Sequence, residues 1–149
     1  IQEAFDTFKS VKRRMEVRGV ENGVTVIDDF AHHPTAVEET LKALKTKYKG
    51  ARLVAVFEPR SWSSRLATFQ EPYARAFAHA DYAIIAGVYN TTKASELGAV
   101  LNVEELVAGI GETGKPAYSF PDADTIVSHL APELKSGDVV AIMSNGGFG

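Results

Sequence analysis

Two acidic residues and two histidines lie close together near the start of the chain, at Asp28, Asp29, His32 and His33. Carboxylates accept hydrogen bonds from hydroxyl groups and imidazoles exchange protons near pH 7, so this set could bind a polar ligand or transfer a proton. The same groups bind divalent metal ions, although their spacing matches no dedicated zinc motif. They could also satisfy free amides at the start of a helix. We favour contact with a substrate or nucleotide, then capping, over a permanent metal site.

The residues on either side of this group predict a strand, a polar loop and a helix. Residues 24–27 are all β-branched, with Val24, Val26 and Ile27 apolar, and from Val37 onward apolar residues recur at helical spacing. Pro34 suits the first turn of a helix, and Thr35 with Glu38 is typical of a capping box. Ligands of open α/β sheets bind beside loops that leave the carboxyl ends of strands. We therefore expect this loop to be the centre of the site.

Later parts of the chain alternate between apolar runs and helical patterns. The runs cover residues 52–57, 82–86, 117–120 and 139–143, and one expected helix carries Leu66, Phe69, Tyr73 and Phe77 on one face. Asn22-Gly23 predicts a hairpin before the first of these units. The pattern indicates an α/β fold with a Rossmann-like, mostly parallel sheet flanked by helices and an N-terminal antiparallel hairpin at its edge.

Parallel strands end on the same side of a sheet, so polar residues that follow them should meet at one rim. These residues are Asp28, Asp29, Glu58, Arg60, Tyr89, Asn90, Ser144 and Asn145. Arg60 and Arg65 are suited to carboxylates or phosphates. A surface ion pair is nearly as favoured for Arg65. Trp62, between them, is either a ligand platform or lid, or a core aromatic.

The composition is that of an ordinary globular protein. The 149 residues are 45% hydrophobic and 23% charged, with a net charge of −3, which argues for one domain and against a nucleic-acid partner. The chain has no cysteine, no signal peptide and no apolar run near the roughly 20 residues of a membrane helix. We expect a cytoplasmic protein without a membrane partner. Because the sequence runs from Ile1 to Gly149 in a glycine-rich stretch, we also expect a piece of a longer protein.

Two motifs together give a resemblance to a known family. Residues 11–16 (VKRRME), followed by residues 28–35 (DDFAHHPT), resemble the C-terminal domain of the Mur ligases, the ATP-dependent enzymes of peptidoglycan assembly. The double-His-Pro-Thr form is shared by the L-alanine-adding branch and by the recycling branch, the murein peptide ligases. Residues 57–61 (FEPRS) and 143–149 (MSNGGFG) look like the recycling branch. The resemblance covers nearly the whole chain and breaks at residues 62–65 (WSSR), where the family pattern has Asn-Thr-Met.

The resemblance implies that residues 1–149 form a single domain, the last of a three-domain ligase. The other domains would bind the UDP-sugar and, through a phosphate loop, ATP and most of the Mg²⁺ contacts; no GxxxxGK[ST] loop occurs in this chain. ATP would phosphorylate the carboxyl group of UDP-N-acetylmuramate. The amine of the murein tripeptide L-Ala-γ-D-Glu-meso-diaminopimelate would then attack the acyl phosphate to form an amide. The isolated domain, without contacts to the other two, should be inactive.

The same resemblance assigns roles to the residues near the first loop. Arg14 would approach the phosphates of ATP, and Asp29 would bind the ribose hydroxyls. His32 and His33 would be the catalytic pair that lines the meeting point of nucleotide and substrates. None of these residues would be a metal ligand.

The substrate-binding residues would follow the later strands. Arg60 and Arg65 would hold a carboxylate of the incoming peptide, and Ser144 and Asn145 would complete that pocket. Three alternatives stay open: an L-alanine ligase with the same fold, a metal-dependent hydrolase built on the first loop, and a non-catalytic nucleotide-binding module.

Overall fold

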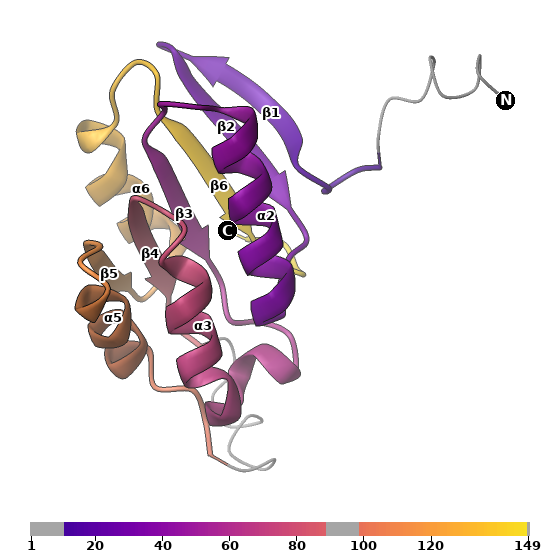
Figure 1. Ribbon diagram of the computed structural model, residues 1–149, viewed down its shortest axis with the longest axis vertical. Helices are drawn as coiled ribbons and strands as arrows, with labels where there is room; N and C mark the ends of the chain where they lie inside the picture. The colour runs from indigo at the N-terminus through magenta and orange to yellow at the C-terminus, as the bar shows by residue number, and fades with distance from the viewer. Residues whose placement is uncertain (1–10, 89–98, 149) are drawn as a thin grey trace, which may run out of the picture.

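The computed structural model describes residues 11–88 and 99–148. Figure 1 shows a twisted sheet with helices packed against it. The strands are β1 (Glu16–Glu21), β2 (Val24–Asp29), β3 (Leu53–Phe57), β4 (Tyr82–Ala86), β5 (Ala117–Phe120) and β6 (Val139–Met143). The helices are α2 (Pro34–Lys47), α3 (Gln70–Phe77), α5 (Val103–Glu112) and α6 (Ala123–Leu130), with 3₁₀ turns η1 (Ser63–Arg65), η2 (Ala67–Phe69) and η3 (Ala131–Glu133). The described helices include none that is long and apolar enough to cross a membrane.

The six strands lie in the order β1-β2-β6-β3-β4-β5. β1 pairs with β2 in antiparallel orientation, and every other neighbouring pair is parallel. The predicted fold class is therefore confirmed, including the antiparallel hairpin at the edge. Asn22 and Gly23 form its turn with φ values of 51° and 79°, the left-handed conformations that a type I′ turn needs at both positions.

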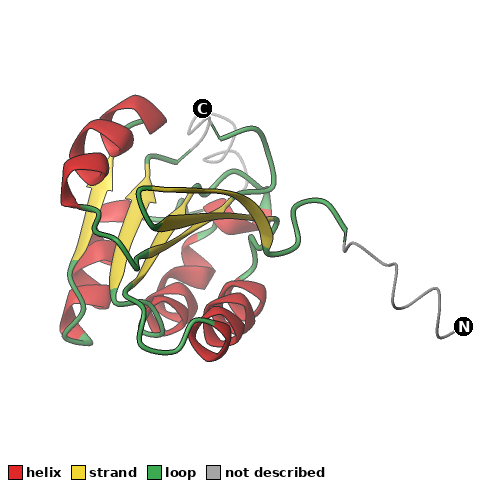
Figure 2. Ribbon diagram, turned by 90° about the horizontal axis from the view of Figure 1, so that it is seen from above, coloured by secondary structure: helices red, strands yellow, loops and turns green. Residues whose placement is uncertain are grey.

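The helices divide the hydrophobic core into two layers. α2, α3 and α5 cover one face of the sheet and α6 covers part of the other, as Figure 2 shows from above. Along β3, Leu53, Ala55 and Phe57 pack into the first layer, whereas Val54 and Val56 pack into the second. Because β3 is buried on both faces, its sequence is apolar without alternation.

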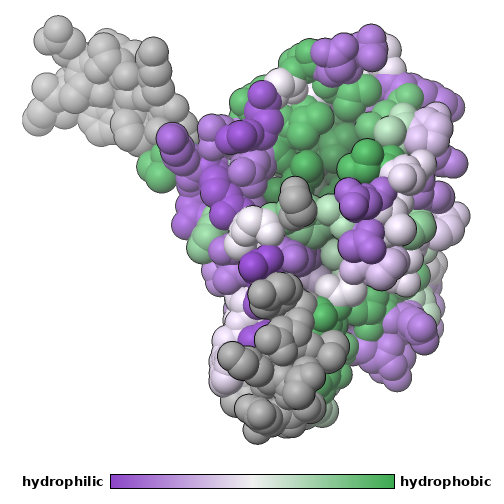
Figure 3. Space-filling model, turned by 180° about the vertical axis from the view of Figure 1, so that it is seen from behind, coloured by the Kyte–Doolittle hydropathy of each residue, from purple (hydrophilic) through white to green (hydrophobic). Residues whose placement is uncertain are grey.

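An apolar groove remains on the second face, where α6 does not reach across β2 and β6. Figure 3 shows this hydrophobic area from behind. The groove has a volume of about 360 Å³, and its lining includes Val26, Ile126, Leu130, Ile142 and Phe148. It lies next to the end of β6.

The predicted capping box at the start of α2 is wrong. The N-cap is His33, whose side chain accepts a hydrogen bond from the Thr35 amide, and Pro34 is the first helical residue. His33 is extended, with φ −102° and ψ 145°. A residue that precedes proline is restricted to this region, so the helix cannot begin earlier. Glu38 instead forms an ion pair with Lys42 at 2.6 Å.

The helix expected to carry Leu66 begins later than the apolar spacing indicates. Leu66 is extended, with φ −90° and ψ 136°, and it forms an isolated bridge with Val100. Ala67 N–H donates to the Ala99 carbonyl at 2.9 Å, and Leu101 N–H donates to the Arg65 carbonyl at 2.8 Å. These long-range hydrogen bonds hold Leu66 extended between the 3₁₀ turns η1 and η2, and the α-helix begins only at Gln70.

An ion pair between Arg52 and Asp138 joins the starts of β3 and β6. Arg52 Nη2 and Nε lie 2.6 and 3.2 Å from the two Asp138 oxygens, and the Lys135 amide donates to the same carboxylate at 2.8 Å. The Arg52 guanidinium lowers the pKa of Asp138 below its ordinary value of 3.8. The stabilisation is therefore complete above pH 3.8 and is lost as the pH falls through the lowered pKa.

We expect Asp138→Asn to lower the free energy of unfolding by about 1–2 kcal/mol at pH 7, because a half-exposed cation loses its charged partner. The difference in unfolding free energy between this variant and wild type should shrink once the pH falls below the lowered pKa of Asp138. Urea unfolding of the chain between pH 7 and pH 2 measures both effects. Glu112→Gln, which removes an exposed carboxylate, is the control and should show neither. A constant difference at all pH values would contradict the assignment.

Candidate functional site

The predicted rim forms where β2, β6 and β3 end side by side. Ser144 N–H donates to the Asp29 carbonyl at 3.2 Å, and Glu58 N–H donates to the Met143 carbonyl at 3.1 Å. The Ser144 hydroxyl donates to Glu58 Oε2 at 2.6 Å. Residues that are 86 positions apart are thus in direct contact. Tyr89 and Asn90, also predicted for this rim, lie outside the described residues.

Asp29 is fixed at the end of β2 by three hydrogen bonds. Its Oδ2 accepts from the Met15 amide at 2.7 Å, and its Oδ1 accepts from the Ala31 amide at 2.8 Å and from Thr40 Oγ1 at 3.3 Å. The residue is only 4% exposed. A carboxylate has about four lone-pair positions, so one position on Oδ2 is left for a ligand.

Asp29 lies on the wall of a cavity of about 410 Å³ that we call the β2 cavity. Its lining also includes Arg14, Phe30 and His32. The Arg14 guanidinium lies over the Phe30 ring, 5.2 Å from its centroid, and stays exposed. Arg14 and Asp29, which the sequence assigned to the nucleotide, thus surround one cavity together with His32, which it assigned to the meeting point of nucleotide and substrates.

The two histidines occupy different environments. His32 Nδ1 lies 2.9 Å from the Phe30 carbonyl, so the neutral ring carries its proton on Nδ1 and leaves the Nε2 lone pair available. His33 is exposed, caps α2 and packs edge-on against Phe69 with 5.0 Å between ring centroids. The capping interpretation thus describes His33, whereas His32 lines the β2 cavity.

The two acidic residues at the end of β2 make different contacts. Asp28 lies 3.4 Å from the Nε of Arg13, whereas Asp29 accepts backbone amides. Within residues 11–88 and 99–148, no three His, Asp or Glu side chains form a group that could hold a metal ion.

Two arginines hold the loop that follows β6. Arg13 Nη2 donates to the carbonyls of Ser144 at 2.5 Å and Gly146 at 2.9 Å. Arg60 Nη1 donates to the Gly147 carbonyl at 2.9 Å and to Glu58 Oε1 at 3.4 Å. A Cβ atom on Gly146 would lie 2.2 Å from Arg60 Nε, so only glycine leaves room for this arginine. The sequence indicated Gly146 only as part of the motif at residues 143–149 and Arg13 only as part of the motif at residues 11–16.

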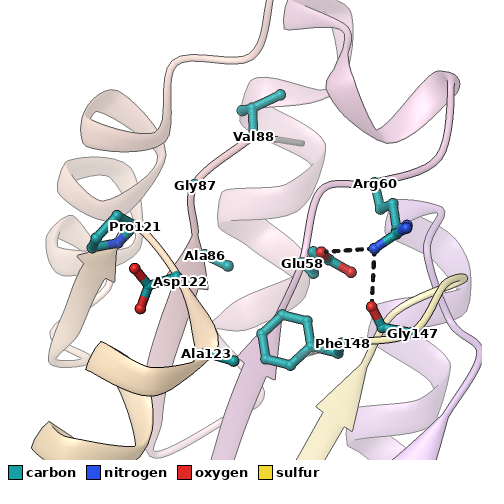
Figure 4. A pocket seen from close by; sticks show the side chains of 10 residues that line it. All are labelled: Glu58, Arg60, Ala86, Gly87, Val88, Pro121, Asp122, Ala123, Gly147 and Phe148. Atoms are coloured by element: carbon teal, nitrogen blue, oxygen red, sulfur yellow. Dashed lines mark hydrogen bonds and ion pairs between the residues drawn. The ribbon is translucent and has the colours of Figure 1, made fainter. Parts of the chain in front are cut away.

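Arg60 also lines a crevice at the ends of β3, β4 and β5, shown in Figure 4. We call it the β4–β5 crevice; its volume is about 510 Å³. Glu58 and Arg60 lie on one side, Asp122 lies on the other, and the Phe148 ring lies between them. After β4 the chain passes to α5 on one face of the sheet, and after β5 it passes to α6 on the other. Such a switch point is where open α/β sheets bind ligands.

Three other residues that the sequence singled out, Arg65, Trp62 and Asn145, lie in different environments. Arg65 is 6% exposed, donates through Nε to the Ser61 carbonyl at 3.3 Å and lies over the Trp62 ring, so it is not the exposed surface arginine that was the alternative for it. Trp62 is 56% exposed and is not a core aromatic. Asn145 Oδ1 is buried and has no hydrogen-bond partner in the described part of the chain. Such an atom is costly unless a ligand reaches it.

Comparison with known proteins identifies the family of the chain. Residues 13–146 match the family described as "Mur ligase, glutamate ligase domain". The chain is 39% identical over 147 residues to the UDP-N-acetylmuramate–L-alanyl-γ-D-glutamyl-meso-2,6-diaminoheptandioate ligase of Escherichia coli K12, covering 98% of this chain and 30% of the relative. It is 33% identical over 147 residues to the UDP-N-acetylmuramate–L-alanine ligase of Nostoc punctiforme, with the same coverage of 98% and 30%.

A solved structure shows the same fold. The crystal structure of a murein peptide ligase from Psychrobacter arcticus matches with a TM-score of 0.78 at 33% identity, covering 98% of this chain and 29% of that one. The chain therefore spans about 30% of the length of its curated relatives. Because the family match covers nearly all of the chain, and because the fold agrees with that of a solved relative, the protein belongs to the Mur ligases and corresponds to their C-terminal domain.

Proposed function

We propose that the chain is the C-terminal, acceptor-binding and nucleotide-clamping domain of an ATP-dependent ligase. The reaction joins UDP-N-acetylmuramate to L-Ala-γ-D-Glu-meso-diaminopimelate through an acyl phosphate, in peptidoglycan recycling. The observation that carries the proposal is that the β2 cavity and the β4–β5 crevice lie at the carboxyl ends of the same sheet. The loop after β6 contacts residues that line both, because Ser144 N–H donates to the Asp29 carbonyl and the Gly147 carbonyl accepts from Arg60. The family match and the similarity to the E. coli ligase support it. An N-terminal domain would supply the UDP-sugar site.

The β2 cavity suits the ribose and phosphates of ATP. The remaining lone pair of Asp29 Oδ2 would accept a ribose hydroxyl, and the exposed guanidinium of Arg14 would reach a phosphate oxygen. His32 would take a proton from the attacking ammonium group through Nε2, with His33 at the edge of the same loop. The phosphate loop and most Mg²⁺ contacts would belong to the central domain, because this chain contains no such loop.

The β4–β5 crevice suits an amino acid that carries both charges. Arg60 would pair with a carboxylate, while Glu58 and Asp122 would receive an ammonium group. The diaminopimelate end of the tripeptide has both groups and does not take part in amide formation. In L-alanine the single amine must instead attack the acyl phosphate, so it cannot pair with these carboxylates. The crevice therefore favours the tripeptide as acceptor.

Other residues would complete the acceptor pocket. Asn145 Oδ1 would accept an N–H of the peptide, and Ser144 would hold Glu58 in place. Arg65 would act through the loop that it supports below Trp62. Closure onto the other domains would orient the amine and exclude water, which would otherwise hydrolyse the acyl phosphate.

The test is acceptor choice by the full-length protein that contains this chain. With ATP, Mg²⁺ and UDP-N-acetylmuramate, we expect the tripeptide to exceed L-alanine in kcat/KM by at least tenfold, measured as phosphate release and as product mass. The isolated 149 residues should form no amide, and removal of Mg²⁺ by chelation should stop the full-length reaction. A preference for L-alanine would assign the protein to the other branch, to which the 33% identical Nostoc punctiforme ligase belongs. ATP binding without any amide product would contradict the ligase proposal.

A further inference from the structure

The side chain of Phe30 contacts the two residues that the proposed function places beside the phosphates of ATP and the attacking amine. We propose that its ring is a positioning group for Arg14 and His32, an inference that rests on the proposed function. Phe30 directly follows Asp29, the last residue of β2, and it is half-buried and lines the β2 cavity. It contacts Arg14 through its ring and His32 through both its ring and its backbone.

The Phe30 ring holds the guanidinium of Arg14. The Arg14 side chain is exposed, and it forms no hydrogen bond or ion pair with any residue in the ranges 11–88 and 99–148. Its guanidinium lies 5.2 Å from the centroid of the Phe30 ring. A long side chain without a polar partner samples many rotamers, and the negative face of an aromatic ring favours those that place the cation over it. The ring thus keeps Arg14 at the wall of the β2 cavity, where an incoming phosphate would meet it.

The same ring limits the orientation of the His32 imidazole. The two rings lie edge to face, with centroids 5.2 Å apart and planes inclined by 82°. The Phe30 carbonyl also lies 2.9 Å from His32 Nδ1. The aromatic contact and the hydrogen bond restrict different parts of the imidazole, so together they fix the direction in which Nε2 points.

Phe30 is itself anchored by Arg13. The Phe30 N–H donates to the Arg13 carbonyl at 2.9 Å, and the Arg13 guanidinium lies 5.4 Å from the centroid of the ring. Arg13 is in turn held by Asp28 and by two carbonyl groups of the loop after β6. Because Arg13 is tied to these three groups, the ring between the two arginines has a fixed support and can restrain the exposed Arg14.

The backbone around Arg14 is constrained by the same end of β2. Arg13 and Met15 have φ values of 56° and 46°, which are left-handed and uncommon for residues other than glycine. Such backbone strain persists only where the surrounding structure imposes it. Met15 N–H donates to Asp29 Oδ2 at 2.7 Å, and Phe30 N–H bonds the carbonyl of Arg13. The main chain is therefore held on both sides of Arg14, while the Phe30 ring restrains the side chain.

The aromatic face of Phe30 can be removed without its backbone contacts. Phe30→Leu keeps an apolar side chain but has no aromatic face for a cation. Phe30→Tyr keeps the ring, and its added hydroxyl can face water because the position is only half-buried. Phe120→Leu is the matched control. Phe120 is also half-buried and packs against a histidine, His129, with 4.6 Å between ring centroids, but in the other core layer.

The first test measures the kinetics of the full-length ligase with ATP and the tripeptide. We expect Phe30→Leu to raise the KM for ATP and to lower kcat, each by about two- to fivefold, which is the effect of losing an exposed cation–π or edge-to-face contact. Phe30→Tyr and Phe120→Leu should keep values close to those of wild type. Equal losses in Phe30→Tyr and Phe30→Leu, or no loss in either, would overturn the proposal.

A double-variant cycle distinguishes positioning from a general loss of stability. If the ring acts on ATP through Arg14, Phe30→Leu should raise the KM for ATP much less in an Arg14→Ala background than in the wild-type enzyme. A purely structural role of the ring would instead give the same increase in both backgrounds, and that result would overturn the assignment.

The last test needs no ligase activity, so the two proposals can fail separately. In ¹H–¹³C spectra of the 149-residue chain, loss of the ring current in Phe30→Leu should move the Arg14 δ-methylene signals downfield and shift the His32 ring signals. Phe120→Leu should move neither set. Unchanged Arg14 and His32 signals in Phe30→Leu would refute the positioning role, even if the wild-type enzyme proves to be a ligase.

Discussion

Replacing Gly146 with alanine is expected to raise the KM for the acceptor at least tenfold in the full-length ligase, with little change in stability. The added Cβ would lie 2.2 Å from Arg60 Nε and 2.3 Å from its Cδ. A flexible side chain can swing away, so the fold survives. The guanidinium, however, would leave the position in which it contacts Glu58 and the Gly147 carbonyl. A lost hydrogen bond between charged groups costs about 1.5–3 kcal/mol, which corresponds to roughly tenfold or more in binding.

The neighbouring glycine provides the control for this experiment. A Cβ on Gly147 would meet nothing within 4 Å, so Gly147→Ala should leave the acceptor KM within twofold of wild type. Arg60→Ala should reproduce the effect of Gly146→Ala, and the double variant should be no worse than either, because both remove the same interaction. An unchanged acceptor KM in Gly146→Ala, with the arginine displaced in its crystal structure, would show that Arg60 does not hold the acceptor.

Phe57→Ala is expected to cause the largest loss of stability, about 3–5 kcal/mol. Phe57 is completely buried at the end of β3, and its ring packs against Tyr73 and Phe77 with centroid distances of 5.0 and 5.4 Å. Truncation removes this contact area and leaves a cavity between the sheet and α3. Since domains of this kind unfold with about 5–15 kcal/mol, the variant should be marginal at 37 °C.

Urea unfolding of the chain at 25 °C measures the loss. Tyr118→Ala removes an aromatic ring from the edge strand β5, where the side chain is 46% exposed, and should cost about 1 kcal/mol or less. Equal losses in the two variants would mean that the layer containing Phe57 is not the main core.

Local sequence patterns predicted most of the fold. The apolar runs located five strands to within two residues, and Asn22-Gly23 specified its turn because few other residues adopt two successive left-handed conformations. The predictions were wrong where contacts with residues distant in the sequence determine the backbone conformation. Leu66 has helical spacing, but its neighbours bond to residues 99–101. The order of the strands could not be predicted either, because a buried strand has the same composition whichever strands lie beside it.

The sequence predicted which residues meet at the rim but not the contacts that they make there. Strand ends correctly brought Asp29, Arg60 and Ser144 to one rim. Nothing in the sequence could show that Ser144 bonds Glu58, or that Asp122, which caps α6, also faces a ligand-sized crevice. Those facts depend on how three separated loops meet.

The position of β6 constrains how the protein forms during synthesis. β6 is the last strand of the chain, yet it lies between β2 and β3, two of the earliest. Until residue 143 has left the ribosome, the nascent sheet lacks its central strand β6, and the facing edges of β2 and β3 are unpaired. Completion must therefore wait for nearly the whole domain to be translated, and interruption shortly before this point would release an intermediate prone to aggregation.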